Sequence, residues 1–248
     1  MIEKFDHYFP FKNTTRKIHV YLPENYAATD EKYPVMYMYD GHNLYDDADA
    51  TYGTSWGLQD FLDQYDKPLI MVGIECSHNG NERLSEYCPY AIDNRFLGSI
   101  DGYGKELMDW IVTDLKPLID QKYRTYPWRE ATAIGGSSMG GLMAFYTVVA
   151  YNQYFSKAAC LSPSISLCMD QLQAEFHAAT IASDTRIYFS FGEAEIKNRE
   201  GVLNDLAYFS EQLETIGGQS HYHLQANGGH NEATWQKQNP LFLDFLWK

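Results

Sequence analysis

One segment of the sequence has the residue types and spacing of a serine nucleophile. Residues 134–141 are Ile-Gly-Gly-Ser-Ser-Met-Gly-Gly, which contains the pattern Gly-x-Ser-x-Gly centred on Ser138. The segment lies between an expected strand and an expected helix, and in that context the serine occupies a tight turn with its hydroxyl exposed. We therefore predict that Ser138 is a nucleophile. The alternative is a helix start rich in glycine and serine, without chemistry.

A serine hydroxyl needs a base to accept its proton. Four histidines follow Ser138 in the chain. His221 and His223 alternate within one expected strand, and His177 lies in a helical stretch, so all three are expected to be structural or solvated. His230 follows the end of an expected strand, in the glycine-containing loop Ala226-Asn227-Gly228-Gly229-His230. Because this position suits a residue that must reach the nucleophile, His230 is the predicted base.

The acid that orients such a histidine is expected after an earlier strand. The expected strand Thr185–Phe191 ends in Gly192-Glu193-Ala194-Glu195. We predict that Glu195 is the acid, with Glu193 as the alternative, while Asp184 lies at the wrong end of the strand. The acid would hold the imidazole tautomer and stabilise the imidazolium rather than take a proton. Either glutamate could instead be an ordinary solvated side chain.

An oxyanion hole needs two backbone N–H donors aimed at the tetrahedral intermediate. The residue after the nucleophile, Met139, supplies one. The loop after the expected strand Val35–Tyr39, with the sequence Asp-Gly-His-Asn-Leu-Tyr, supplies the other, and the amide of His42 is the best candidate.

Three segments of the chain resemble the putative esterase family of α/β hydrolases, which includes esterase D-like, feruloyl-esterase-like and enterochelin-esterase-like enzymes. They are residues 33–41, residues 136–141, and residues 228–232 with Trp235 behind them. The resemblance implies an α/β-hydrolase fold with Ser138 as nucleophile, His230 as base and Glu195 as acid. Two features depart from the family: relatives commonly have Gln where His42 stands, and many have Asp where Glu195 stands.

The elements that must position these residues alternate between short β-rich runs and helical patterns. This alternation predicts one α/β domain over residues 1–248, with a mainly parallel central sheet and helices on both faces. The expected strands are Lys17–Leu22, Val35–Tyr39, Leu69–Ile74, Thr132–Gly135, Lys157–Leu161, Thr185–Phe191 and His221–Gln225. The stretch between the strands at Lys157 and Thr185 has room for one or two short helices, which predicts little or no lid domain and an open pocket.

Four helices are expected. One of them has an apolar face, because its hydrophobic residues recur at steps of three and four. These residues are Leu107, Trp110, Ile111, Leu115, Leu118 and Ile119. Pro117 is expected to kink that helix. The other three run over Met139–Ala150, near Val202–Ile216 and around Leu241–Trp247.

Two long connections, Asp40–Trp56 and Cys76–Tyr103, are expected to form the walls of a site, since loops of that length are usually functional or disordered. The aromatic rings in or beside them could stack on a sugar or phenolic group; they are Tyr52, Trp56, Tyr87, Tyr90 and Tyr103. The predicted substrate-binding residues are Asn43, Trp56, Arg83 and Tyr87.

The charge and the remaining motifs exclude several function classes. The net charge of −14 disfavours nucleic acid and anionic membranes. Residues 1–7 lack the basic and apolar stretch of a signal peptide, and the four cysteines form no CxxC pair, which predicts a cytoplasmic protein with reduced thiols. The acidic loop at residues 46–53 does not fit a calcium loop, and no HExxH motif, clustered Cys/His set or P-loop occurs. No metal and no cofactor are therefore predicted.

These observations predict a serine carboxylic-ester hydrolase that acts on a small or solvent-accessible ester through an acyl-enzyme. An acyltransferase with the same triad is the first alternative. A non-catalytic binding module on the same scaffold is the second. The expected partner is a small-molecule ester, and the sequence does not predict the oligomeric state.

Overall fold

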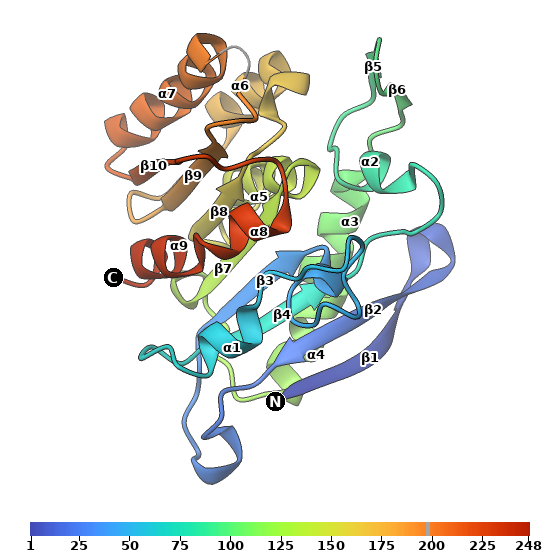
Figure 1. The fold of residues 1–248 in the computed structure, drawn as a ribbon, viewed down its shortest axis with the longest axis vertical. Helices are drawn as coiled ribbons and strands as arrows, with labels where there is room; N and C mark the ends of the chain where they lie inside the picture. Colours follow the sequence, from blue (N-terminus) through green and yellow to red (C-terminus); the bar gives the residue numbers. More distant parts are fainter. Residues whose placement is uncertain (197–198) are drawn as a thin grey trace.

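The centre of the computed structural model, which describes residues 1–196 and 199–248, is a twisted sheet (Figure 1). In the described ranges the order of its strands is β1-β2-β4-β3-β7-β8-β9-β10. The strands are β1 (Ile2–Phe9), β2 (Thr14–Tyr21), β3 (Val35–Tyr39), β4 (Ile70–Ile74), β7 (Thr132–Ser137), β8 (Lys157–Leu161), β9 (Arg186–Gly192) and β10 (Gln219–Gln225). Neighbours from β4 to β10 pair in parallel, whereas β2 is antiparallel to both of its neighbours. The predicted mainly parallel sheet is confirmed.

Two strand pairings were not expected from the sequence. Strand β1 pairs with β2 as an antiparallel edge strand, from Ile2 opposite Tyr21 to Phe9 opposite Thr14. Most of its side chains are only partly buried or exposed, so it lacks the continuous apolar run of a central strand. A small hairpin of β5 (Ile92–Asn94) and β6 (Gly98–Ile100) lies within the second long connection.

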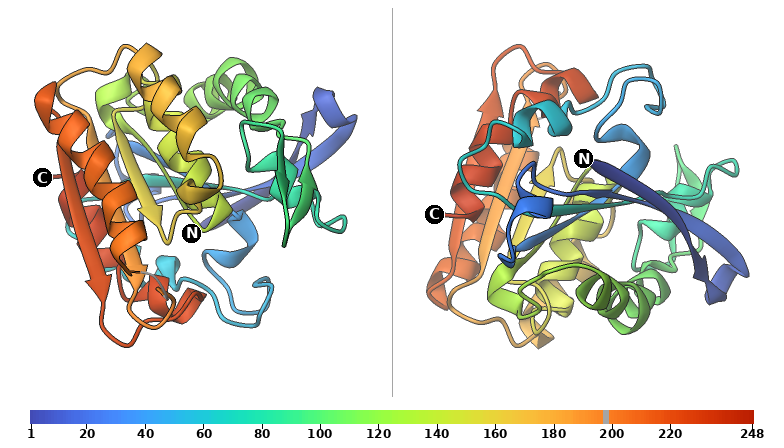
Figure 2. Two further views of the ribbon diagram at one scale, coloured as in Figure 1. Left: turned by 90° about the horizontal axis from the view of Figure 1, so that it is seen from above. Right: turned by 90° about the horizontal axis from the view of Figure 1, so that it is seen from below.

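Helices cover both faces of the sheet (Figure 2). They are α1 (Leu58–Leu62), α2 (Glu82–Glu86), α3 (Gly104–Trp110), α4 (Lys116–Lys122), α5 (Met139–Ala150), α6 (Met169–Ala178), α7 (Arg199–Thr215), α8 (Glu232–Gln236) and α9 (Asn239–Leu246). Successive side chains of a strand point to opposite faces. Accordingly, Tyr37 packs in a cluster with residues of α3 to α7, while its neighbour Met36 packs with residues of α1, α8 and α9.

The helix expected around residues 107–119 is interrupted. Helix α3 passes into a π-helical turn over Ile111–Leu115 and then into α4. Pro117 lacks the N–H that would continue the regular hydrogen-bond ladder, which accounts for an irregular turn just before it. Leu107, Ile111 and Leu115 remain fully buried, so the predicted apolar face survives the irregularity.

The sheet brings the polar loops together at one edge, because the carboxyl ends of parallel strands lie side by side. Between β8 and β9 the chain forms a 3-10 turn at Ile165–Leu167 and helix α6, in agreement with the expected one or two short helices. Among the helices in the described parts of the chain, none has the length and apolar character needed to cross a bilayer.

Candidate active site

Ser138 lies at the sharp turn between β7 and α5. Its backbone torsions are φ 58° and ψ −120°, a conformation that is strained for a residue with a side chain. The turn is held by hydrogen bonds from the Ser138 N–H to the Leu161 carbonyl (2.9 Å) and from the Leu142 N–H to the Ser138 carbonyl (3.0 Å). Gly136 is needed here, because a Cβ at that position would lie 2.8 Å from backbone atoms of Gly140. The serine thus occupies the strand–turn–helix geometry that its motif predicts.

His230 and Glu195 meet at the same edge of the sheet. The Nδ1 atom of His230 lies 2.5 Å from Oε2 of Glu195. The other oxygen of Glu195, Oε1, accepts hydrogen bonds from the Ser162 hydroxyl (2.7 Å) and the Gly192 N–H (2.5 Å). Trp235 packs edge-on against the His230 ring and donates its Nε1–H to Ser162 (3.0 Å). Both oxygens of the glutamate are therefore fixed by donors.

The electrostatics favour an ionised Glu195. Burial by itself would raise the pKa of this carboxyl, but the hydrogen bonds from His230, Ser162 and Gly192 outweigh burial and leave the pKa below its ordinary value. Glu193, the alternative acid, is exposed and accepts a hydrogen bond from the Asn227 N–H instead (3.3 Å). Of the two glutamates, the structure brings Glu195 to His230.

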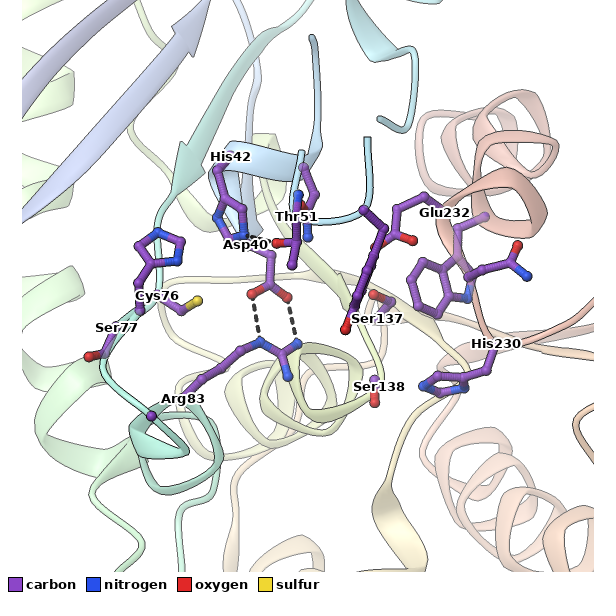
Figure 3. A pocket seen from close by; sticks show the side chains of 16 residues that line it. Asp40, His42, Thr51, Cys76, Ser77, Arg83, Ser137, Ser138, His230 and Glu232 are labelled. Atoms are coloured by element: carbon purple, nitrogen blue, oxygen red, sulfur yellow. Dashed lines mark hydrogen bonds and ion pairs between the residues drawn. The ribbon is translucent and has the colours of Figure 1, made fainter. Parts of the chain in front are cut away.

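Ser138 and His230 line one cavity of about 650 Å³. The His230 ring is turned toward Ser138, although Figure 3 marks no hydrogen bond between them. Such bonds often tighten only once substrate is bound. The cavity is lined by residues of both long connections and of the loop after β10, so the expected role of those connections as its walls is confirmed.

The two predicted oxyanion donors lie at starts of helical turns. Met139 is the first residue of α5, and His42 lies in a 3-10 helix over Gly41–Asn43 that follows β3. N–H groups at the start of a helix lack intrahelical acceptors, so they are available to a ligand. The loop that carries His42 lies directly against β4. A Cβ on Gly41 would be 2.6 Å from the carbonyl carbon of Gly73.

A partly buried ion pair holds the loop before His42. Asp40, at φ 58°, accepts two hydrogen bonds of 2.7 Å from Arg83, and its own N–H donates to the Tyr87 hydroxyl (3.0 Å). Burial would raise the pKa of Asp40, but the Arg83 guanidinium holds it below its usual value. Arg83 also stacks on the Tyr87 ring, 5.0 Å from its centroid. These contacts hold Asp40, whose backbone is in the left-handed conformation, at the wall of the cavity.

The four predicted substrate-binding residues fall into two groups. Asn43 and Arg83 line the cavity. Trp56 and Tyr87 are buried in the core, 3% and 0% exposed, and the structure does not bring them to the cavity surface. Trp56 packs on Trp235, and Tyr87 supports Asp40. Packing in the core removes the apolar area of these two rings from water, which corrects their expected position.

Sequence reasoning missed three further side chains of the cavity. Glu232 lines it, and burial raises the pKa of its carboxyl. Cys76 and His78 also line it, and together with His42 they place one nitrogen or sulfur atom each within 4.8 Å of one another. The sequence places these residues after two expected strands, but only the structure shows that β3 and β4 are adjacent and parallel. His42 lies three residues after the end of β3. Cys76 and His78 lie two and four residues after the end of β4.

Comparisons with known proteins agree with this architecture. Residues 11–241 match the family model described as "Putative esterase". Over 206 residues the chain is 23% identical to the Bacillus subtilis protein YbbA, covering 82% of this chain and 78% of that one. Over 155 residues it is 27% identical to the Mycobacterium tuberculosis protein named Esterase Rv1288, covering 62% of this chain and 30% of that one.

Among solved structures, an IroE-like serine hydrolase from Shewanella oneidensis superposes with a TM-score of 0.77 at 19% identity, covering 99% of this chain and 79% of that one. At that identity the likeness concerns the fold alone. The predicted α/β-hydrolase fold is confirmed.

Proposed function

Since this chain belongs to the putative esterase family and is an ester-hydrolysing enzyme, we propose that it is a serine carboxylic-ester hydrolase with Ser138, His230 and Glu195 as its triad. The observation that carries the proposal is the contact of 2.5 Å between Glu195 and His230 Nδ1, beside a strained serine that lines the same cavity. An ionised carboxylate on Nδ1 keeps the proton there, so Nε2 remains free to act as a base.

In the proposed first step, the Ser138 Oγ attacks the acyl carbonyl carbon while His230 Nε2 takes its proton. The carbonyl oxygen becomes an oxyanion, which accepts hydrogen bonds from the backbone amides of Met139 and His42. When the intermediate collapses, the alcohol leaves with the proton from His230, and the acyl group stays on Ser138. Water then attacks the acyl-enzyme while His230 takes its proton. When this second intermediate collapses, His230 returns the proton to the Ser138 oxygen and the acid is released.

The proposed substrates are small or solvent-accessible esters. The His230 side chain is 45% exposed, and the stretch between β8 and β9 adds only one 3-10 turn and one helix. Water can therefore reach the acyl-enzyme, as hydrolysis requires. Asn43 and Arg83 are the proposed contacts for the substrate, because both line the cavity.

The test is to compare Ser138→Ala with Ser137→Ala, the adjacent serine, which also lines the cavity. Labelling by a fluorophosphonate probe and hydrolysis of p-nitrophenyl butyrate are measured for both. Ser138→Ala should lose labelling, and its kcat should fall on the order of a millionfold. Ser137→Ala should still be labelled. Retained labelling and hydrolysis in Ser138→Ala would refute the proposed nucleophile.

A further inference from the structure

We propose that His42, Cys76 and His78 form a binding site for one zinc-class divalent cation in the wall of the cavity. One donor atom from each residue lies within 4.8 Å of the other two. In Figure 3, His42 and Cys76 lie on the far side of the cavity from His230. This inference goes beyond ester hydrolysis and does not depend on the proposed triad.

The donor set suits zinc better than calcium or magnesium. Two imidazoles and one thiolate are the borderline and soft ligands that Zn²⁺ prefers, whereas Ca²⁺ and Mg²⁺ take oxygen ligands. Zinc with three protein ligands keeps a fourth position open to water or substrate. Because all three residues line the cavity, that fourth position would face its interior.

The spacing of the donors is close to what a tetrahedral ion requires. Zinc bonds of 2.0–2.1 Å to nitrogen and 2.3 Å to sulfur put neighbouring donor atoms about 3.5 Å apart. Donor atoms that lie as far as 4.8 Å apart must therefore move closer by up to about 1.3 Å when the ion binds. The His78 side chain is 58% exposed and can make this movement without disturbing the core.

His42 carries an independent sign of a missing ligand. The residue is only 6% exposed, and its Nδ1 atom is buried without a hydrogen-bond partner. The other ring nitrogen, Nε2, is 3.0 Å from the Thr51 hydroxyl. A buried polar atom without a partner costs free energy, and unsatisfied groups in native proteins often mark an ion or a functional role. A cation on Nδ1 would satisfy this atom.

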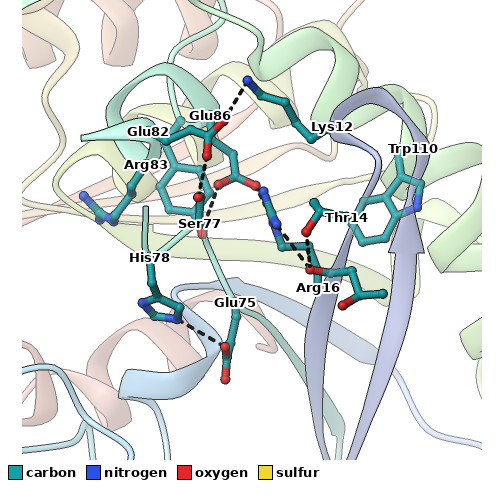
Figure 4. Close-up of polar contacts among 12 residues, drawn as sticks. Lys12, Thr14, Arg16, Glu75, Ser77, His78, Glu82, Arg83, Glu86 and Trp110 are labelled. Atoms are coloured by element: carbon teal, nitrogen blue, oxygen red, sulfur yellow. Dashed lines mark hydrogen bonds and ion pairs between the residues drawn. The ribbon is translucent and has the colours of Figure 1, made fainter. Parts of the chain in front are cut away.

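His78 has the second contact that metal-binding histidines usually have. Its Nε2 lies 3.2 Å from Oε2 of Glu75, as Figure 4 shows, which leaves Nδ1 for an ion. Glu75 is itself held by His19, whose Nε2 lies 2.7 Å from Oε1. A carboxylate on the outer nitrogen of a ligating imidazole orients the ring and strengthens it as a ligand.

The surrounding charges favour a cation. Asp40 acts electrostatically on the Cys76 thiol, and Glu75 contacts His78, so two carboxylates adjoin the cluster. Arg83 brings a positive charge, but both of its hydrogen bonds to Asp40 tie it to that carboxylate. On binding, the Cys76 S–H bond breaks, the sulfur electron pair goes to the metal, and the proton leaves to solvent. This step needs no oxidant or reductant.

The experiment titrates the full chain, kept under a phosphine reductant, with Co²⁺ and then displaces the cobalt with Zn²⁺. Binding at the cluster should give a thiolate-to-cobalt charge-transfer band in the near ultraviolet with one ion per chain. Cys76→Ala should abolish the band, and His78→Gln should weaken zinc affinity by about tenfold or more. The matched controls are Cys160→Ala and His177→Gln, which lie outside the cavity and should bind as the unmodified protein does.

His78 is exposed, so His78→Gln stays informative even if Cys76→Ala fails to fold. The Ser138→Ala variant should bind the ion normally, which separates this inference from the proposed hydrolysis. The absence of a charge-transfer band from the folded protein would overturn the proposal. A band that persists in Cys76→Ala, or an unchanged zinc affinity in His78→Gln, would overturn it equally.

Discussion

The two walls of the cavity hold their polar side chains in different ways. The triad wall, at the ends of β7 and β10, carries Ser138 and His230, with Glu195 behind His230 at the end of β9. The ion-pair wall, at the ends of β3 and β4 and in α2, carries Asp40, His42, Cys76, His78 and Arg83. In the triad wall the His230 side chain is 45% exposed, whereas in the ion-pair wall Asp40 is buried with both oxygens engaged by Arg83.

This difference separates two tasks. A group that transfers protons must reach both substrate and water, so it is held through one nitrogen and left accessible at the other. A loop that presents a backbone amide must not move, and here Asp40, beside that amide, is held in a fixed pair with Arg83. Substitutions in the triad wall should therefore affect turnover more than stability. Substitutions in the ion-pair wall should affect stability first.

The largest expected effect is on turnover, in Glu195→Gln. The Gly192 N–H can only donate, so the glutamine must keep its oxygen there and turn its NH₂ toward His230 Nδ1. The imidazole then carries its proton on Nε2 and cannot accept one from Ser138. We expect kcat to fall on the order of 10³- to 10⁴-fold with little change in thermal stability. Glu193→Gln is the matched control and should keep its activity, and equal losses in the two variants would contradict the assignment.

The next largest effect is on stability, in Asp40→Asn. Asparagine tolerates the left-handed backbone but leaves the largely buried Arg83 without its counter-charge. Urea unfolding should show that the free energy of unfolding falls by about 2–3 kcal/mol. Asp49→Asn, which removes an exposed pair with Lys4, should cost less than about 0.5 kcal/mol. If the two substitutions lower the free energy of unfolding by the same amount, the ion-pair wall is not a rigid element.

Glu75→Gln tests the same wall through pH. Hydrogen bonds from His19 and His78 outweigh burial and lower the pKa of Glu75 from 4.5 to about 2. A carboxyl with a lowered pKa stabilises the fold fully above pH 4.5, and the contribution is lost as the pH falls toward about 2.

Glu75→Gln should therefore be less stable by about 1–2 kcal/mol at neutral pH, and this difference should shrink through the acidic range. Urea unfolding at a series of pH values measures it, with the exposed Glu106→Gln as control. A difference from the unmodified protein that stays constant with pH would show that Glu75 does not act through its charge.

The smallest expected effect is in Tyr87→Phe, which removes the hydroxyl that accepts the Asp40 N–H. A buried amide without its acceptor should cost about 1 kcal/mol of stability. KM should not change, because the Tyr87 ring lies in the core. Tyr52→Phe, at a residue that lines the cavity and is 80% exposed, should leave stability unchanged. A raised KM at full stability in Tyr87→Phe would instead support the substrate contact expected from the sequence.

The triad wall could be predicted from the sequence because each of its residues lies in a short local pattern. Glycines flank Ser138 between a strand and a helix, Glu195 follows a strand and a glycine, and His230 follows a strand and two glycines. These patterns reflect backbone requirements of turns, which are local in the chain. The choice between Glu193 and Glu195 needed the structure, because it depends on which carboxylate reaches His230.

The ion-pair wall could not be predicted in the same way. Asp40 and Arg83 are 43 residues apart, and nothing local to either indicates the other. The cluster of His42, Cys76 and His78 depends on which strands are adjacent, and the order β4-β3-β7 is a property of the whole sheet. Trp56 was expected at the cavity for a related reason, because composition alone does not tell whether a ring in a long connection faces solvent or core.

The backbone contact between Gly41 and Gly73 has a practical consequence for altering this protein. Any larger residue at either position would push the two chain segments apart, since even a methyl group at Gly41 would lie 2.6 Å from the other backbone. Libraries that diversify the cavity for new acyl groups should keep both glycines and vary Asn43, Thr51 and Tyr52, whose side chains border open space. Selection would then explore specificity without discarding most clones to misfolding.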